Sequence, residues 1–313
     1  MAVYTEVPAE ALARFLAGYD VGALVMAKGI AEGVSNSNYL VETTGGRFIL
    51  TLYERRIETS DLPWFLGLMA HLADAGLPVP RPRPDRHGRV LQRLCGRDAA
   101  LIGWLPGVSV TEPTRAQCRA VGEALARLHL AGADYPATRP NRLGLDFAQE
   151  SSDLLGDRLD ALEPGLRDLV ASALDRLAAG WPKGLPRGII HADLFPDNVL
   201  FLDERISGLI DFYFAACDLL AYDLAVLRVA WSFSADGRHF FPERDAALRA
   251  GYQSVRPLLA KEDAALPLLS ELACLRFLLT RALDHFEATA AALVQRKDPL
   301  AFARRLRHIR RHG

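Results

Sequence analysis

The sequence predicts an α+β protein with two lobes, a small lobe built on an antiparallel sheet and a larger, mostly helical lobe. Apolar runs of strand length, separated by turn residues, fill much of the first hundred positions. After position 107 apolar residues instead recur at helical spacing. The length of 313 residues suits about two domains. We therefore expect a first lobe over residues 1–104 and a second over residues 105–313.

The first lobe is expected to hold five strands and two helices. The predicted elements are a helix over 6–18, strands over 23–30, 38–43 and 47–53, a helix over 61–75, and strands over 89–94 and 98–104. The Thr-Gly-Gly turn at 44–46 predicts a tight hairpin. Asp61 is a candidate N-cap, with Pro63 in the first turn of its helix. The proline-rich stretch 77–84 favours an extended connector.

The second lobe is expected to be mostly helical. Helices are predicted over 114–130 and 166–179 and from residue 222 to the end, with a loop over 139–144. The stretch 187–201 carries polar residues between two apolar runs, and with the run 205–211 it is expected to form a small strand pair. The arginine-rich segment 304–312 is expected on the solvated face of a last helix.

The composition excludes several classes of protein. A net charge of −1 gives no general sign of a nucleic-acid or membrane surface. The chain lacks a signal-peptide pattern at its start and an apolar run of about 18 residues, the length of a membrane span. Its four cysteines form no Cys-x-x-Cys pair, which argues against zinc and disulfide frameworks. We expect a cytoplasmic protein whose partner is a small molecule, and the oligomeric state stays open.

The polar stretch in the second lobe has a spacing typical of phosphoryl transfer. His191, Asp193 and Asn198 form the pattern His-x-Asp-x4-Asn, and Asp211 follows thirteen residues after Asn198. Transfer from a nucleotide needs a base near the attacking hydroxyl and oxygen ligands for metal ions. We expect Asp193 to be the base and Asn198 and Asp211 to bind Mg²⁺. His191 either supports the loop, which we favour, or takes part in catalysis. The alternative for Asp193 and Asn198 is simple turn capping.

These residues resemble a known group of enzymes. The segment 191–198 is similar to the catalytic loop of the aminoglycoside phosphotransferase/choline kinase superfamily, which shares the protein-kinase fold. The absence of Arg after His191, and the triplet Asp211-Phe-Tyr in place of Asp-Phe-Gly, fit that branch better than the protein kinases. The resemblance implies a two-lobed protein-kinase-like fold with ATP and Mg²⁺ as cofactors. It also suggests that Asp223 fastens the start of a helix to the catalytic loop.

Further stretches resemble the homoserine kinases of this superfamily. The matching segments are 29–39, 48–54, 61–65, 76–80 and 139–145. This resemblance implies ATP-dependent phosphorylation of the L-homoserine hydroxyl, a step of threonine biosynthesis. Two alternatives stay open. One is a kinase of the same fold that acts on choline, an aminoglycoside, methylthioribose or a ketosamine. The other is an inactive nucleotide-binding module.

The nucleotide is expected to bind the first lobe. The loop 29–38 carries small polar residues that can approach phosphates. The candidates there are Gly33, Ser35, Asn36 and Ser37, and in the connecting strand Ile102 and Trp104 are expected to offer backbone groups to adenine. One position departs from many kinases, because Thr51 or a neighbour stands where a strand lysine is expected. Arg55 or Arg56 is our candidate for the missing positive charge.

The acceptor, if it is homoserine, presents a carboxylate and an ammonium group. An arginine can bind a carboxylate with two parallel hydrogen bonds, so arginines near the loop are the first candidates. We select Arg139 and Asn141 from the loop 139–144, and Asp197 from the catalytic loop.

Overall fold

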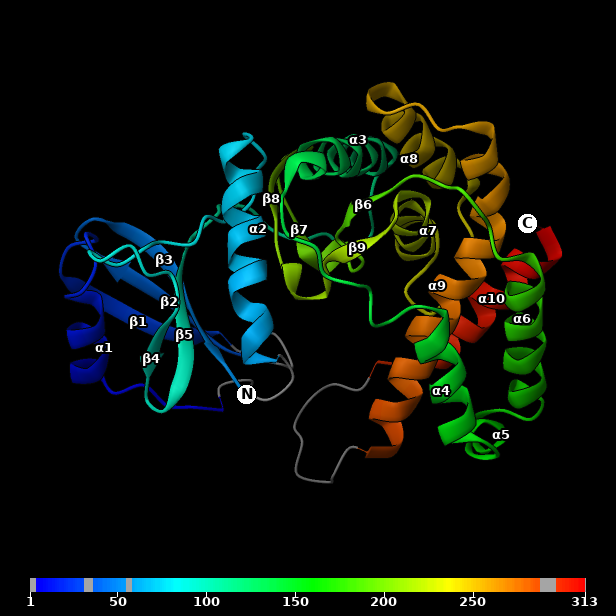
Figure 1. Cartoon of the computed structure of the whole chain (residues 1–313), viewed down its shortest axis with the longest axis horizontal. Coiled ribbons are helices and arrows are strands. Elements are labelled where there is room, and N and C mark those ends of the chain that lie inside the picture. The colour runs from blue at the N-terminus through cyan, green and yellow to red at the C-terminus, as the bar shows by residue number, and fades with distance from the viewer. Residues whose placement is uncertain (1–3, 31–35, 55–57, 288–296, 313) are drawn as a thin grey trace. The chain divides into compact units, whose positions relative to one another are not determined.

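The computed structural model describes residues 4–30, 36–54, 58–287 and 297–312, and it divides into two compact units (Figure 1). The first unit comprises Met1–Gly107 and Ser207–Tyr213, and the second comprises Val108–Ile206 and Phe214–Gly313. The first unit runs to Gly107, past the predicted boundary at 104, and it also takes in a segment from further along the chain. The short segment Ser207–Tyr213, expected in the second lobe, packs with the first unit, because the Leu209 N–H donates to the Pro78 carbonyl oxygen at 2.8 Å.

The first unit is a five-stranded antiparallel sheet with two helices. Its elements are α1 (Ala9–Leu16), β1 (Leu24–Ile30), β2 (Asn36–Thr43), β3 (Gly46–Tyr53), the 3₁₀ turn η1 (Thr59–Asp61), α2 (Leu62–Asp74), β4 (Gln92–Leu94) and β5 (Arg97–Gly103). The strand order is β1-β2-β3-β5-β4, and Figure 1 shows α1 and α2 on either side of this sheet. The predicted number and order of elements are confirmed.

Alternation along the strands explains how this sheet packs. Every second residue of β2 and β3 points to one face, and there Val41, Phe48 and Leu50 meet Leu12 and Leu16 of α1 in one core. The hairpin turn is confirmed, because β2 and β3 pair up to their last residues on either side of it. The helix α2 starts as predicted, but its preceding residue makes no side-chain cap, since a 3₁₀ turn already leads into the helix.

The second unit holds eight α-helices among its described residues and two small two-stranded sheets. Its elements are α3 (Arg115–Ala131), η2 (Gly132–Asp134), α4 (Leu145–Leu155), α5 (Arg158–Leu162), α6 (Leu166–Gly180), β6 (Arg187–Ile190), η3 (Pro196–Asn198), β7 (Val199–Leu202), β8 (Arg205–Leu209), η4 (Phe212–Phe214), β9 (Ala216–Leu219), α7 (Leu220–Trp231), α8 (Pro242–Val255), α9 (Ala260–Glu287) and α10 (Leu300–His312). The border between the units runs through β8 and η4.

Helix α3 shows how sequence directs this packing. Thr114 caps it with a full capping box, in which Thr114 and Gln117 each accept a backbone N–H of the other. Its middle lies against α8 at unusually short range. A side chain on Gly122 would meet the Leu248 carbonyl at 2.1 Å, and one on Gly251 would meet the Arg119 carbonyl at 2.1 Å. Glycine at both positions therefore lets the two backbones approach.

Several details of the second unit were not predicted. The stretch 187–201 and the run 205–211 do not pair simply with each other, because β6 pairs with β9 while β7 pairs with β8. The helices α4 and α5 and the strand β9 were missed. The arginine-rich helix α10 is only partly solvated, since Arg305 is 3% exposed. The guanidinium of Arg305 lies over the aromatic rings of Phe233 and Phe302.

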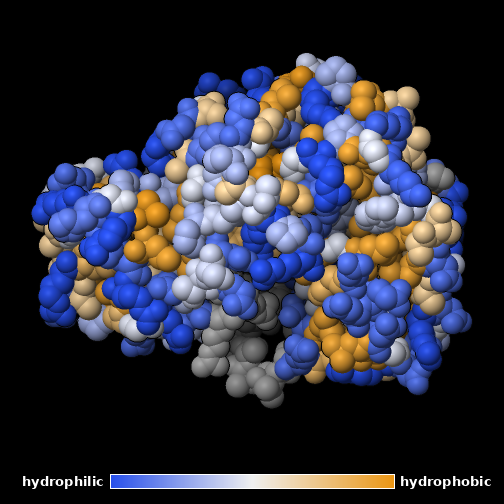
Figure 2. All heavy atoms as spheres, in the orientation of Figure 1, coloured by the Kyte–Doolittle hydropathy of each residue, from blue (hydrophilic) through white to orange (hydrophobic). Residues whose placement is uncertain are grey.

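The face seen in Figure 2 is largely hydrophilic, with apolar patches of limited extent. Within the part of the chain that the structure describes, no helix is long and apolar enough to cross a membrane. All four cysteines are free.

Candidate active site

The predicted catalytic loop joins β6 to β7 in the second unit. Its backbone turns sharply at Ala192, which has a left-handed φ of +63°. A residue with a Cβ atom adopts this conformation at a cost of about 1–2 kcal/mol. The short 3₁₀ turn η3 follows, begun by Pro196, whose fixed φ suits that first position. A strained loop of this kind requires strong interactions that hold it.

Asp223 of α7 supplies the first of these interactions. Its two carboxylate oxygens accept the backbone N–H groups of His191 and Ala192, both at 2.7 Å. Asp223 is 1% exposed. Burial alone would raise its pKa, but the hydrogen bond and electrostatic attraction of His129, together with the charge and backbone N–H of His191, hold the pKa below its ordinary value. The prediction that Asp223 fastens the start of a helix to this loop is confirmed.

A buried chain of polar side chains extends from Asp223 to the start of α9. His129 Nε2 donates to Asp223 at 3.0 Å, because an ionised carboxylate can only accept. His129 Nδ1 lies 2.8 Å from the Tyr252 hydroxyl, which Arg256 contacts at 3.1 Å. Arg256 in turn donates to Glu262 at 3.0 Å. Asp223, which anchors the loop, is therefore connected through this chain to the helices α3, α8 and α9.

The polar residues of the loop contact one another closely. The Asn198 side-chain nitrogen donates to the Asp193 carbonyl at 2.7 Å and lies 3.2 Å from its carboxylate. The side-chain oxygen of Asn198 therefore faces away from Asp193. His191 is fully buried, and its Nδ1 accepts the Asp193 N–H at 3.3 Å. These contacts suit the loop-supporting role expected of His191, and its assignment stays a prediction.

Sequence reasoning missed one residue at this loop. Arg276 of α9 donates from Nη1 to the Ala192 carbonyl, and its Nη2 lies 3.8 Å from the Asp193 carboxylate. It is 2% exposed, and its guanidinium lies over the ring of Phe277 at 4.5 Å. The signal was present in the sequence, because one arginine interrupts the apolar run 272–279 in the middle of α9.

Asp211, the second predicted metal ligand, belongs to the first unit. Its side chain is exposed and its backbone is left-handed, with a φ of +65°. Close to it lie hydroxyl groups, with Tyr213 2.9 Å from Tyr53. Burial raises the pKa of Tyr213, and the charge of Asp211 raises it further. At the position expected for a lysine, the Thr51 hydroxyl donates to Asn38 at 2.8 Å.

The nucleotide candidates have different outcomes. Gly33, Ser35, Arg55 and Arg56 lie outside the described residues. The predicted loop 29–38 was too long, because β1 and β2 extend into it from both sides. Asn36 is 6% exposed at the start of β2, and its side-chain oxygen has no hydrogen-bond partner within the described part of the chain.

Ser37, another nucleotide candidate, bonds within the first unit. Its hydroxyl donates to Glu54 at 2.6 Å and accepts the N–H groups of Tyr4 and Thr5 at 2.8 and 3.1 Å. A serine hydroxyl has one donor and two acceptor positions, so all three are occupied. Its side chain is also fully buried. Ser37 therefore ties the N-terminal segment to the sheet in this structure, and its assignment to the nucleotide stays a prediction.

The two adenine candidates lie at the end of β5. Ile102 stands opposite Ile49 of β3. The residues before and after it form backbone hydrogen bonds with Arg83 and Arg81 of the proline-rich connector. Alternation therefore turns the peptide groups of Ile102 toward β3. Trp104 is 37% exposed, and its N–H donates weakly to the Arg47 carbonyl at 3.4 Å. Their assignment stays a prediction.

The acceptor candidates lie in two places on the second unit. Arg139 donates to the Ala215 carbonyl at 3.1 Å, and Asn141 donates to Asp218 at 2.9 Å. These contacts fasten the loop 139–144 to β9 and to the residue before it, and β9 pairs with β6 just before the catalytic loop. Asp197 is exposed and pairs with Lys297 at 3.1 Å. Their role in binding an acceptor stays a prediction.

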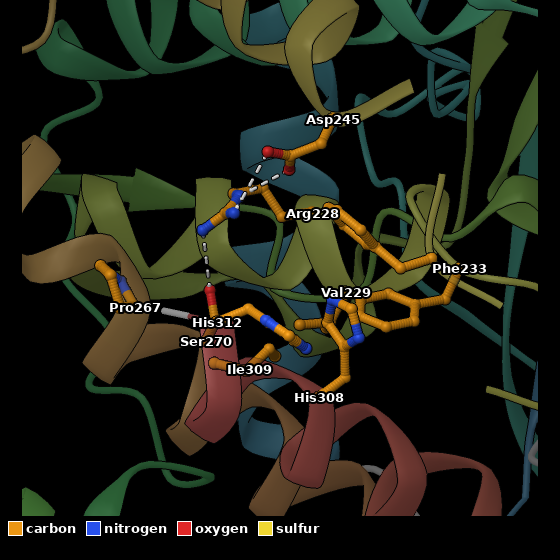
Figure 3. A pocket seen from close by; sticks show the side chains of 10 residues that line it. Arg228, Val229, Phe233, Asp245, Pro267, Ser270, His308, Ile309 and His312 are labelled. Atoms are coloured by element: carbon orange, nitrogen blue, oxygen red, sulfur yellow. Dashed lines mark hydrogen bonds and ion pairs between the residues drawn. The ribbon is translucent and has the colours of Figure 1, made fainter. Parts of the chain in front are cut away.

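A pocket elsewhere in the second unit contains none of the predicted site residues (Figure 3). Arg228 crosses it and bonds to Asp245 at 2.6 Å and to Ser270 at 3.4 Å. His308 faces the ring of Phe233 on the opposite wall. The polar side chains Arg228, Asp245 and Ser270 in this pocket hydrogen-bond to one another. The pocket is therefore not part of the predicted site.

Comparison with known proteins extends these observations. Residues 27–258 match the model of the phosphotransferase enzyme family. The chain is 57% identical to a homoserine kinase of Acidiphilium cryptum and 53% identical to one of Granulibacter bethesdensis, and each comparison covers 98% of this chain and 96% of the relative. An amicoumacin kinase structure has a similar fold at 17% identity, with a TM-score of 0.72 over 97% of this chain and 94% of that one. The two-lobed α+β fold, similar to that of protein kinases, is thereby confirmed, and the chain belongs to the phosphotransferase enzyme family.

Proposed function

We propose that this protein is a homoserine kinase, which transfers the γ-phosphoryl group of ATP to the hydroxyl of L-homoserine. The observation that carries the proposal is the identity of more than half of all residues with curated homoserine kinases over nearly the full length of both chains. A match that spans both units favours a common substrate as well as a common fold. The predicted loop chemistry supports the same reaction class.

Asp193 is the proposed base in this reaction. It accepts or orients the proton of the homoserine hydroxyl as that oxygen attacks phosphorus. Its loop is rigid, because Asp223 binds one side of the neighbouring peptide group and Asn198 binds Asp193 itself. Rigid placement suits a reaction in which positioning and electrostatics supply most of the rate.

Mg²⁺ is the proposed metal, and the donor chemistry of two residues fits it. Asn198 of the second unit has its amide nitrogen bound to Asp193, which leaves an amide oxygen for a hard cation. Asp211 of the first unit adds an exposed carboxylate. Mg²⁺, when bound, neutralises charge on the nucleotide phosphates. The first unit is the proposed nucleotide side, and Arg139, Asn141 and Asp197 are the proposed contacts of the acceptor.

The decisive experiment measures ADP release with a panel of acceptors. The panel contains L-homoserine, choline, methylthioribose, an aminoglycoside and a ketosamine, each with ATP and Mg²⁺. We expect turnover with L-homoserine to exceed turnover with every other acceptor by a wide margin. Absence of homoserine-dependent ADP release would remove the proposal, and a preference for another acceptor would replace the substrate.

Substitutions separate the proposed roles. D193N should lower kcat by about 10²–10⁴-fold, because it removes the base while keeping the shape of the side chain. D211N should raise the Mg²⁺ concentration needed for half-maximal rate. Its control is D203N, because Asp203 is also exposed with a left-handed φ, here +56°, but lies in the turn between β7 and β8. Equal Mg²⁺ dependence of these two variants would contradict the metal role of Asp211.

A further inference from the structure

Arg276 brings a buried positive charge to the catalytic loop from a distant part of the chain. It stands in the middle of α9, 84 residues from Ala192, to whose carbonyl oxygen its Nη1 donates. Its Nη2 lies 3.8 Å from the Asp193 carboxylate, close enough for electrostatic attraction and too far for a hydrogen bond. Arg276 therefore contacts both Ala192 and Asp193, the two residues at the turn of the loop.

The burial of this guanidinium is costly for stability. Taking an arginine out of water costs several kcal/mol, and an apolar residue of similar volume is often as stable or more so. Arg276 recovers part of the cost by lying over the rings of Phe214 at 5.3 Å and Phe277 at 4.5 Å. Its Nε atom is buried and has no hydrogen-bond partner among the described residues. Stability alone therefore gives a weak reason for an arginine here.

The strained peptide beside Asp193 gives a stronger reason. Ala192 is left-handed, so the peptide groups on its two sides need separate support. Asp223 accepts the Ala192 N–H on one side, and Arg276 donates to the Ala192 carbonyl on the other. Two buried groups of opposite charge thus hold one residue from opposite directions. Loss of either support would allow the turn to relax and Asp193 to move.

We propose that Arg276 is a positioning residue, which holds the Ala192 carbonyl and the Asp193 carboxylate in the arrangement needed for phosphoryl transfer. The inference rests on the proposed function, since it assumes Asp193 to be the base. Arg276 acts through the loop and not on the substrate. A displacement of about 1 Å in a reacting group can lower a rate about 10²-fold, so the contribution should appear in kcat.

The test compares R276M and R276K with a matched control, R305M. Arg305 of α10 is also buried, at 3% exposed, lies 4.3 Å over the Phe302 ring and donates to the Ser234 carbonyl at 2.9 Å. None of these contacts reaches the catalytic loop. Thermal unfolding and steady-state kinetics with ATP and L-homoserine are measured for all variants and for the wild type.

We expect R276M to lose about 10²-fold in kcat with both KM values within about threefold of wild type. R276K keeps a charged donor for the Ala192 carbonyl and should recover part of the loss. R305M should lower the melting temperature as R276M does and keep its kcat within about threefold. A kcat for R276M equal to that of R305M would overturn the proposal. So would a homoserine KM raised tenfold at unchanged kcat, which would make Arg276 a substrate ligand.

Two further outcomes keep the test decisive. If R276M does not fold, R276K alone decides, because a kcat equal to wild type would show that the two-point contact is not needed. The wild type separates this inference from the proposed function. Wild-type protein without homoserine-dependent turnover would refute the function, whereas active wild type with an unaffected R276M would refute only the role of Arg276.

Discussion

Removal of the Asp223 carboxylate is expected to destabilise the protein strongly. The side chain accepts three hydrogen bonds, from His129 at 3.0 Å and from the N–H groups of His191 and Ala192 at 2.7 Å. D223A leaves two buried backbone donors unpaired, at about 1–3 kcal/mol each. It also leaves the buried Nε2–H of His129 without its acceptor, at a further cost of about 1–3 kcal/mol. We expect the free energy of unfolding to fall by about 3–9 kcal/mol for the three lost hydrogen bonds together.

Urea unfolding provides the measurement, and the fluorescence of Trp231 is a suitable probe, because its indole donates to the Leu194 carbonyl within the loop at 2.8 Å. D197A is the control, since Asp197 lies in the same loop but forms an exposed pair with Lys297 at 3.1 Å. Exposed pairs contribute about 0–1 kcal/mol. If D223A were no less stable than D197A, the carboxylate would not be the anchor of the loop.

Three more predictions concern stability. G122A should destabilise by about 1–3 kcal/mol or more, since its new methyl group meets the Leu248 carbonyl, whereas at Gly144 the nearest atoms lie 3.9 Å away and G144A should change little; calorimetry of both variants checks this. Y252F should cost about 1–2 kcal/mol in urea unfolding, because the Tyr252 hydroxyl joins two buried polar side chains, and an unchanged midpoint would contradict it. The folded pKa of Asp223 is lowered from its ordinary 3.8, so its stabilisation is complete above that pH and is lost as pH falls through the folded pKa. The stability difference between wild type and D223N should therefore be constant from pH 7 to pH 5, and a difference that closes near pH 6 would refute the linkage.

Local patterns explain which parts of the fold could be predicted. The hairpin between β2 and β3 follows from its turn residues, and α3 follows from Thr114 and the helical spacing after it. The predicted catalytic loop rests on a local pattern, because Asp193 and Asn198 are only five residues apart, and in the structure the two contact each other directly. In each case the residues that determine the structure are neighbours in sequence.

Contacts over long sequence distances explain the failures. Arg276 reaches the loop from 84 residues away, and no periodic pattern connects the two segments. Ser37 appeared to be a loop residue among small polar neighbours, and only the folded N-terminal segment shows that Tyr4 and Thr5 occupy its hydroxyl. The strand β9 has only four residues, and its extended conformation depends on pairing with β6. Tertiary partners decide such elements, and local propensity carries little information about them.

The contact between α3 and α8 links helix packing to the catalytic loop. Gly122 and His129 are seven residues apart, which is about two turns of one face of α3. On α8, Gly251 precedes Tyr252, whose hydroxyl bonds to His129 at 2.8 Å. Close approach at the two glycines therefore sets the distance at which His129 meets Tyr252, and His129 in turn binds Asp223. A substituent at Gly122 would push the two helices apart and so weaken the His129–Tyr252 hydrogen bond. The catalytic loop would be affected only through that bond. The sequence motif predicts the reacting groups, whereas glycines far from them determine how firmly their loop is held.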